Sequence, residues 1–533
     1  TDILYIAASE VVKNMHALIT RYPVSDAYGL FVAKPNPVST LQTEVVMING
    51  TIYKHYPKID FDIPRHKIGI RFIDTLQFSN SYLDGLGGDY DGDQVTIKLI
   101  WSQEANAECD EVMNMKSFFI SPSGTNVRKM KYEVYQTFYD MTREPYETSK
   151  KVSEEDKKML LKKDPKEFTF TFLSDLFADK IYNGKTRKSK YEVNDIIHLN
   201  VGEYYNKTSM DTTIGRLCWN KIMIDRVGLR SFFPYNNEVL IKNKATEYEE
   251  EVTRLLREDD ITTDTFRKYI DHRDWLGLQL HGLITISFTE KTMKTPVSVV
   301  KLRDELFEKY DKELKEGDIV VAGRIEKELI AAMVDIIKDD PGFDLYRSGA
   351  RGDINNHMKN LFIMRGGVLN PNTGKYDIMK TSFNDGLRKE DFTAASNSVV
   401  QGAYPKAVGT ADSGYLAKQL MAGNQTEVIG QKDCGTERTL DFVLEKDDVK
   451  DFMYRNINDN GNTILLTTKN IDSYVGKKIH LYTPMFCTGK YLCEKCSGKQ
   501  DSKFAGLDTN KIATTLTNLN MKKFHDSTLR FTA

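Results

Sequence analysis

A long hydrophobic run is the first feature that the sequence lacks. Nowhere in its 533 residues do 18 or more apolar residues follow one another, and a membrane-spanning helix needs about that many. The first ten residues, TDILYIAASE, also lack the basic start and long apolar stretch of a signal peptide. The sequence therefore predicts a soluble protein without a membrane span, long enough for several domains and a large buried core.

Net charge is also nearly absent. The 74 Lys and Arg residues almost balance the 76 Asp and Glu residues, which leaves a net charge of −2. Such a balance does not indicate a nucleic-acid partner, and it does not exclude one, because a large protein can hold a basic channel within a neutral total.

Cysteine is scarce, with six residues in the whole chain. Two of them stand alone, and the other four lie in the last fifth of the sequence, at Cys434, Cys487, Cys493 and Cys496. This distribution is not that of a disulfide framework. It indicates a reducing compartment and a single metal site.

The hydrophobic pattern changes along the chain. Residues 1–100 carry β-branched and aromatic residues between turn signals, which predicts strands. Residues 101–345 place apolar residues three and four apart, which predicts helices. A segment rich in Ala, Gly and Ser covers 382–425, and short strands and turns are expected again over 426–510. Without internal repeats or low-complexity tracts, this is the pattern of a multidomain α+β protein.

Three carboxylates crowd into five residues of GGDYDGDQV, residues 87–95. In an extended loop alternate side chains point the same way, so Asp89, Asp91 and Asp93 are expected to converge, while the glycines let the backbone turn. Carboxylates held together repel one another, and a hard divalent cation such as Mg²⁺ removes that conflict. The motif therefore favours a Mg²⁺ site.

The same loop has two other interpretations. One is a polar turn with solvated acidic residues. The other is a calcium loop of the EF-hand type, which needs Gly at its sixth position and Glu at its twelfth. Counted from Asp89, those positions hold Gln94 and Ile100, so the EF-hand pattern fails.

The loop resembles the Asn-Ala-Asp-Phe-Asp-Gly-Asp-Gln segment of the β′ (largest) subunit of multisubunit DNA-dependent RNA polymerases. Further segments resemble that subunit in the same order along the chain. They are SQEANAE with SFFISPSG (102–124), DTTIGRLCW (211–219), SGARG (348–352) with MRGG (364–367), GTADSGYLAKQL (409–420), DCGT (433–436) with CTGKYLCEKCSG (487–498), and LTNLNMKKFH (516–525).

The resemblance implies a multidomain α+β fold whose catalytic core is a double-psi β-barrel. It also implies five regions. These are the barrel with the Asp loop at 1–135, a helical pore or funnel-like region at 136–345, the segment leading into and including the bridge helix at 346–425, a zinc-binding module at 426–510, and the first trigger-loop helix at 511–533.

The function implied by the resemblance is DNA-directed RNA synthesis, a nucleotidyl transfer that uses two Mg²⁺ ions. The triad Asp89, Asp91 and Asp93 would hold one ion, and the second would arrive with the NTP. Partners would be β-like subunits with the second barrel, other β′ fragments with clamp and jaw, a promoter-specificity factor, DNA template and RNA product. The expected location is the cytoplasm, that of a bacterial host if a phage encodes the chain.

The resemblance also assigns substrate contacts. The assigned residues are Arg21 in TRYP (20–23), Thr410 and Ala411 in the bridge helix, and Met521, Lys522 and His525 in the trigger helix. Two positions depart from the family. Gly87 replaces the Asn that contacts the NTP ribose, and Lys522 replaces an Arg, which keeps the charge without bidentate geometry.

The cysteines carry the second metal prediction. Cys493 and Cys496 form a Cys-x₂-Cys knuckle, and with Cys434 and Cys487 they supply four thiolates, the donor set of a closed tetrahedral Zn²⁺ site. The spacing between the second and third cysteines is one residue shorter than in the family. The alternative is a set of free buried cysteines.

Regions of β′ are missing from the match. The chain is expected to lack the N-terminal clamp, the first zinc ribbon, the second trigger helix and the jaw. This indicates either a β′ split between polypeptides, as in giant bacteriophages, or an incomplete sequence. Two alternatives stay open: an RNA-dependent RNA polymerase of the two-barrel type, which also has a Tyr in its Asp loop, and a non-catalytic scaffold that contains zinc.

Overall fold

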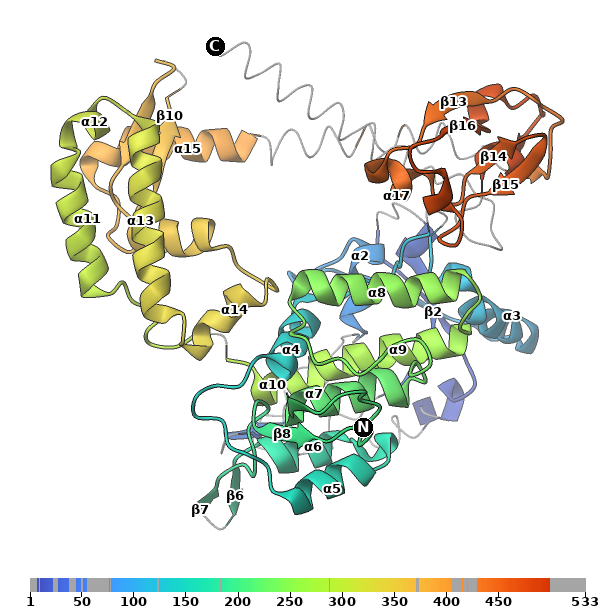
Figure 1. The fold of residues 1–533 in the computed structure, drawn as a ribbon, viewed down its shortest axis with the longest axis horizontal. Helices are drawn as coiled ribbons and strands as arrows, with labels where there is room; N and C mark the ends of the chain where they lie inside the picture. The colour runs from blue at the N-terminus through green and yellow to red at the C-terminus, as the bar shows by residue number, and fades with distance from the viewer. Residues whose placement is uncertain are drawn as a thin grey trace, which may run out of the picture.

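A computed structural model gives the fold (Figure 1). It describes residues 7–8, 10–22, 27–37, 45–48, 51–54, 76, 78–121, 124–182, 185–286, 288–370, 373–404, 415, 419 and 429–498. Within these ranges, none of the helices combines the length and the apolar composition that crossing a membrane requires.

A small sheet is built from strands that lie before and after the Asp loop in the sequence. Strand β1 (Ala17–Thr20) pairs antiparallel with both β2 (Leu30–Ala33) and β5 (Thr96–Leu99), and it buries alternate residues, Ala17 and Ile19. A separate hairpin joins β3 (Val45–Ile48) to β4 (Thr51–Lys54). The described residues show these sheets and not a complete double-psi barrel, which remains a prediction.

The largest core lies in a helical body that follows the sheet. Its apolar side chains include the fully buried Trp219, Phe138 and Phe266. The helices that enclose this core are α3 (Gln103–Asn114), α4 (Tyr132–Thr142), α5 (Glu154–Lys162), α6 (Phe170–Phe177), α7 (Ile214–Trp219), α8 (Lys242–Arg257), α9 (Thr263–Trp275) and α10 (His281–Ile284), with π-helical turns η6 (Asn220–Arg226) and η7 (Leu276–Leu280).

The hydrophobic pattern predicted helices over residues 101–345, but part of this stretch forms strands. It contains two hairpins, β6 (Lys180–Tyr182) with β7 (Lys185–Arg187) and β8 (Ile196–Leu199) with β9 (Met210–Thr213). Strand β9 leads directly into α7, where the Thr213 hydroxyl accepts a hydrogen bond from the Arg216 backbone N–H and so caps the helix.

A second helical body has its own core (Figure 1, yellow-green to orange). Its long helix α13 (Ile319–Ile337) buries Ile325, Leu329, Met333 and Ile337, which follow one another at intervals of four residues, and it forms where the sequence predicted a helix. The other elements are α11 (Val297–Lys309), α12 (Asp311–Lys315), α14 (Asp344–Arg347), the π-helix η9 (Ile354–Ile363), the hairpin β10 (Gly366–Leu369) with β11 (Tyr376–Met379), and α15 (Phe392–Tyr404).

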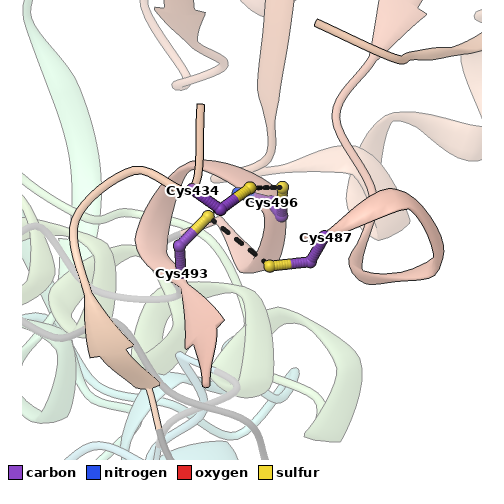
Figure 2. Close-up of side chains that lie close together, drawn as sticks. All are labelled: Cys434, Cys487, Cys493 and Cys496. Atoms are coloured by element: carbon purple, nitrogen blue, oxygen red, sulfur yellow. Dashed lines mark hydrogen bonds between the residues drawn. The ribbon is translucent and has the colours of Figure 1, made fainter. Parts of the chain in front are cut away.

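The C-terminal described part, 429–498, forms a small β module. Its sheet has the order β13-β16-β14-β15, and a parallel pair, β12 with β17, lies beside helix α18 where the four cysteines meet (Figure 2). The bounds are β12 (Ile429–Gln431), β13 (Leu440–Val443), α17 (Val449–Phe452), β14 (Asn456–Asp459), β15 (Asn462–Leu465), β16 (Lys478–Leu481), β17 (Leu492–Cys493) and α18 (Glu494–Ser497).

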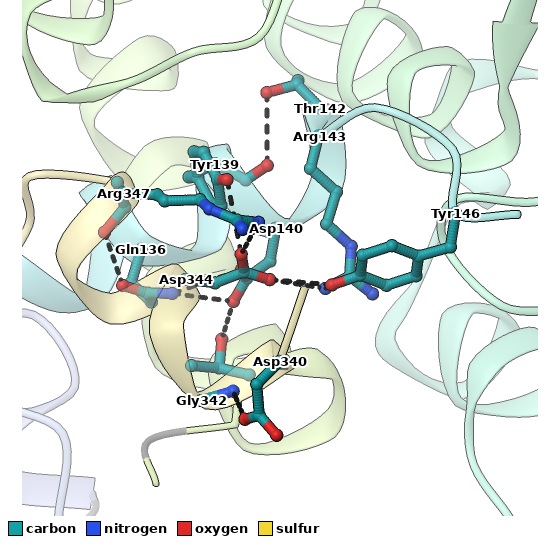
Figure 3. A network of polar contacts seen from close by, with 12 residues as sticks. Gln136, Tyr139, Asp140, Thr142, Arg143, Tyr146, Asp340, Gly342, Asp344 and Arg347 are labelled. Carbon is teal, nitrogen blue, oxygen red and sulfur yellow. Dashed lines mark hydrogen bonds and ion pairs between the residues drawn. The ribbon is translucent and has the colours of Figure 1, made fainter. Parts of the chain in front are cut away.

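A buried polar network joins the two helical bodies (Figure 3). The carboxylate of Asp344 on α14 accepts hydrogen bonds from Arg143 (2.8 Å) and from the hydroxyl of Tyr146 (3.0 Å), both in the segment after α4. Beside it, Asp140 of α4 accepts from Gln136 and from the Thr285 hydroxyl, the latter at 2.7 Å. Because Asp140 and Asp344 are each 2% exposed, these contacts form in a water-excluded joint.

Candidate metal centres

The Asp loop begins where a single helical turn ends. Helix α2 (Leu83–Leu86) stops at Gly87, whose φ of +59° lies in the left-handed region, and the Gly88 N–H bonds back to the Leu83 carbonyl. Gly92 turns the chain again with a φ of +113°. Residues that carry a side chain rarely adopt positive φ values. The glycines in the motif therefore allow the backbone of the three aspartates to turn tightly.

The structure brings the three carboxylates together. One oxygen from each of Asp89, Asp91 and Asp93 lies within 4.8 Å of the others. Asp93 accepts a hydrogen bond from the Asp89 N–H (3.0 Å), and the Asp91 N–H donates to the Asp89 carboxylate (3.2 Å). Asp89 and Asp91 face solvent, so the cluster is open to a ligand. Its role in binding metal stays a prediction.

Arg21 lies against this cluster. Its Nε is 2.7 Å from the Asp93 carboxylate, which makes it the neighbour that fixes this side chain. The hydrogen bond to Arg21 lowers the pKa of Asp93, and the same bond raises the pKa of Arg21. The resemblance predicts that Arg21 contacts the NTP ribose, and this stays a prediction; the structure shows its contact with a carboxylate of the loop.

The neighbouring carboxylate of Asp89 has the opposite effect on the pKa of Asp91. The hydrogen bond and repulsion with Asp89 raise the pKa of Asp91 above the usual value. The loop therefore holds one carboxylate that is paired with a cation and one whose charge is disfavoured. Hard oxygen donors with uncompensated charge are what Mg²⁺ binds, so the residues present fit that ion.

Four different parts of the module supply the cysteines (Figure 2). Cys434 follows β12, Cys487 follows a 3₁₀ turn (Pro484–Phe486), Cys493 ends β17, and Cys496 lies in α18. The Sγ of Cys493 also caps α18 by accepting from the Cys496 backbone N–H at 3.4 Å. The knuckle is therefore pre-formed by the local fold.

The sulfur positions match a tetrahedral centre. The Sγ atoms of Cys434 and Cys496 are 3.7 Å apart, and those of Cys487 and Cys493 are 3.8 Å apart. A zinc ion with Zn–S bonds of about 2.3 Å requires an edge of about 3.8 Å between tetrahedral sulfurs. All four sulfurs lie within 4.8 Å of one another, so the donor set and its geometry fit Zn²⁺.

The thiols differ in how readily they ionise. Burial raises the pKa of Cys493 and of Cys496. At Cys434 burial also disfavours the thiolate, but hydrogen bonds from Thr488 and from the Thr436 backbone outweigh it and lower the pKa to about 6. Cys434 thus ionises more readily than Cys493 and Cys496, and a bound cation would favour the thiolate at those two.

Other predicted site residues lie outside the described part of the chain. They are Thr410, Ala411, Met521, Lys522 and His525. One contact near the Asp loop was missed by sequence reasoning: the Tyr90 hydroxyl donates a hydrogen bond to the side chain of Asn80. The only signal for it was a Tyr where the resembled β′ loop has Phe.

Comparison with known proteins gives many similar chains, among them several that are named DNA-directed RNA polymerase subunit beta′. No protein-family model matches. The chain is 23% identical over 80% of its length to the DNA-directed RNA polymerase subunit beta′ of Pelotomaculum thermopropionicum, 24% over 77% to that of Shouchella clausii, and 23% over 87% to that of Caldanaerobacter subterraneus subsp. tengcongensis.

These similarities define the class of the protein, a relative of subunits of DNA-directed RNA polymerases. Within that class it is a divergent β′-like chain, which confirms the resemblance carried by its motifs. The chain spans 35%, 37% and 42% of the lengths of these three relatives, so the similarity covers less than half of each.

Proposed function

We propose that this chain is the catalytic β′-type part of a DNA-directed RNA polymerase and carries out template-directed nucleotidyl transfer in a multisubunit complex. The observation that carries the proposal is the convergence of Asp89, Asp91 and Asp93 on an open loop, in a chain similar to β′ over 70–87% of its length. A scaffold without catalytic function would have no need for three mutually repelling carboxylates.

The loop residues would hold and orient the reacting groups. Two Mg²⁺ ions, one held by the loop and one delivered with the NTP, would stabilise the attacking and leaving oxygens of the displacement. Asp89 and Asp91 present their oxygens to solvent, where an RNA 3′ end and an NTP have access. Arg21 fixes Asp93 from the other side. Because no covalent intermediate is needed, positioning and electrostatics account for most of the rate.

The cysteine cluster would serve structure. Four thiolates close the coordination sphere of a Zn²⁺ ion and leave no position for substrate. The ion would tie together Cys434 and the knuckle, which are some 60 residues apart in the sequence.

The remaining roles follow from the proposed family role. Partners would be β-like subunits with the second barrel, other β′ fragments with clamp and jaw, a specificity factor, DNA template and RNA. Arg21, Thr410, Ala411, Met521, Lys522 and His525 would contact the NTP or the template. A split β′ of the phage type and a cytoplasmic location, in the host cell if a phage encodes the chain, belong to the same proposal.

Substitution of one loop carboxylate tests the proposal. Asp91→Ala should abolish RNA synthesis by the purified complex, by about 100-fold or more in elongation rate, while leaving assembly intact, because it removes one of the three carboxylates that would hold the ion. Glu111→Ala, an exposed acidic residue on α3, is the control. Undiminished elongation by Asp91→Ala would refute the assignment, and a complex that extends only on RNA templates would favour the two-barrel RNA-dependent class.

A further inference from the structure

The Asp loop needs support that its own sequence does not supply. It is rich in glycine, and Asp89, Tyr90 and Asp91 are exposed. Among the residues that the structure describes, two polar side-chain contacts tie the loop to its surroundings. One is the ion pair of Asp93 with Arg21, and the other is the hydrogen bond from Tyr90 to Asn80.

Asn80 uses both ends of its side-chain amide. Its Oδ1 accepts the hydrogen bond from the Tyr90 hydroxyl, and its Nδ2 donates to the carboxylate of Glu133. Glu133 lies in the first turn of α4, and the next residues of this helix, Val134 and Phe138, are buried in the main core. Asn80 therefore links an exposed loop to a helix that is packed into the largest core.

The position of Asn80 is itself fixed by neighbouring contacts. Ser79 donates a hydrogen bond to Asp274, and that carboxylate is held by the fully buried Arg273 at 2.8 Å. Four residues after Asn80, Asp84 forms an ion pair with Lys131, which lies just before α4. Because the backbone on both sides of Asn80 is anchored, the amide is already in place when Tyr90 meets it, and little entropy is lost in forming the bond.

The hydroxyl of Tyr90 distinguishes this chain from the β′ loop that it resembles. That loop has Phe at this position, which lacks a donor and cannot make the contact. The Asn80–Tyr90 bond is therefore a feature of this sequence rather than a consequence of the shared motif.

We propose that Asn80 and Tyr90 are positioning residues that hold the loop bearing Asp89, Asp91 and Asp93 in its metal-binding geometry by tethering it to Glu133 of α4. The metal-binding part of this inference rests on the proposed function. The tether itself does not, because it can be observed without any metal.

Hydrogen–deuterium exchange of the metal-free purified complex tests the tether directly. Tyr90→Phe and Asn80→Ala should each speed amide exchange in peptides that cover residues 87–95, by about 2- to 10-fold, the range set by the net free energy of one hydrogen bond. Tyr22→Phe is the matched control, because Tyr22 and Tyr90 are both 74% exposed. It should leave exchange over 87–95 unchanged.

Metal binding supplies the second readout. In the same complexes, the dissociation constant for Mn²⁺, measured by electron paramagnetic resonance, should rise about 2- to 10-fold in Tyr90→Phe and in Asn80→Ala. The Mg²⁺ concentration for half-maximal RNA synthesis should rise by a similar factor, while the rate at saturating Mg²⁺ falls less. In the double variant, the rise in the Mn²⁺ dissociation constant should not exceed that of the more affected single variant, because both changes break the same tether.

The inference would be overturned if, in both variants, amide exchange over residues 87–95 and Mn²⁺ affinity equalled those of the unchanged protein. It would also be overturned if Tyr22→Phe changed exchange and affinity as much as Tyr90→Phe does. Failure of the proposed function has a different signature. The unchanged complex would then bind no Mn²⁺ at the loop, while the exchange experiment would still show whether the tether exists.

Discussion

Asp140 shows what a single buried carboxylate does to this protein. It is 2% exposed at the joint of the two helical bodies, where Gln136 and Thr285 donate to it (Figure 3). Burial raises the pKa of Asp140 to about 7, against the hydrogen bonds and the Arg143 charge that lower it. At neutral pH the residue therefore lies at the midpoint of its titration.

The sign of the resulting pH dependence follows from proton binding. Between about pH 4, where an unfolded Asp titrates, and pH 7, the folded chain keeps a proton that the unfolded chain has lost. The stability contributed by Asp140 is thus fully present below about pH 4 and is lost as the pH rises through 7. The total change is up to about 4 kcal/mol for a shift of this size.

Asp140→Asn removes this titration. The variant should unfold at a higher temperature than the unchanged protein at pH 8, and the difference should shrink or reverse at pH 5. Thermal unfolding at both pH values measures it, with Asp339→Asn, an exposed residue after α13, as control. A difference between the two proteins that is the same at pH 5 and pH 8 would contradict the assignment.

At the scale of the element, α7 shows why the DTTIGR segment needs its glycine. Every residue of α7 is buried. A Cβ at Gly215 would lie 2.3 Å from the Met141 carbonyl oxygen and 2.8 Å from that of Val193. Both are backbone atoms of packed neighbours, so neither can move aside cheaply. The helix approaches α4 as closely as it does because residue 215 has no side chain.

Two matched substitutions test this packing. Gly215→Ala should destabilise the protein by about 1–3 kcal/mol through overpacking. Gly323→Ala on α13 has no neighbouring atom within 4 Å and should be neutral or stabilising by up to about 1 kcal/mol, because Ala favours a helix. Chemical denaturation of both variants measures the difference. Equal stabilities would show that α7 adjusts freely.

Element prediction succeeded where the signal was local. The spacing of Ile325, Leu329 and Met333 predicted α13, and the Ser102 and Ser153 caps begin the predicted helices α3 and α5. Strands β6 to β9 were missed, because each has only three or four residues and is defined by pairing with its neighbour. Such short segments have no period long enough to read.

At the scale of the whole molecule, a partly buried polar cluster joins the β module to the helical body in the part of the chain that the structure describes. Tyr454 accepts a hydrogen bond from Arg257 at 2.6 Å and donates to Glu258 at 3.2 Å, and Thr468 donates to the same carboxylate. The cysteine site lies in this module. A bound zinc ion would therefore stabilise the same unit that contacts the helical body through Tyr454 and Thr468.

Zinc removal should unfold this module first. Cys496→Ser should lower the zinc content of the purified complex from about one per chain to near zero and make residues 429–498 sensitive to protease, while the helical bodies stay protected. Elemental analysis and limited proteolysis measure both effects. Cys109→Ser, on α3 outside the cluster, should keep its zinc. If the purified unchanged protein contained no zinc, the assignment of the four cysteines as a zinc site would be contradicted.

The sequence by itself determined the local chemistry. The spacing in GGDYDGDQV brings three carboxylates together because alternate residues of a tight loop share a side, and the ordered motifs revealed the relation to β′. The tertiary structure decided what depends on distant segments: the meeting of Cys434 with its three partners, the ion pair of Arg21 with Asp93, the link from Tyr90 through Asn80 to α4, and the burial that raises the pKa of Asp140. A linear pattern records neighbours along the chain, whereas these contacts arise only when separate elements pack and exclude water.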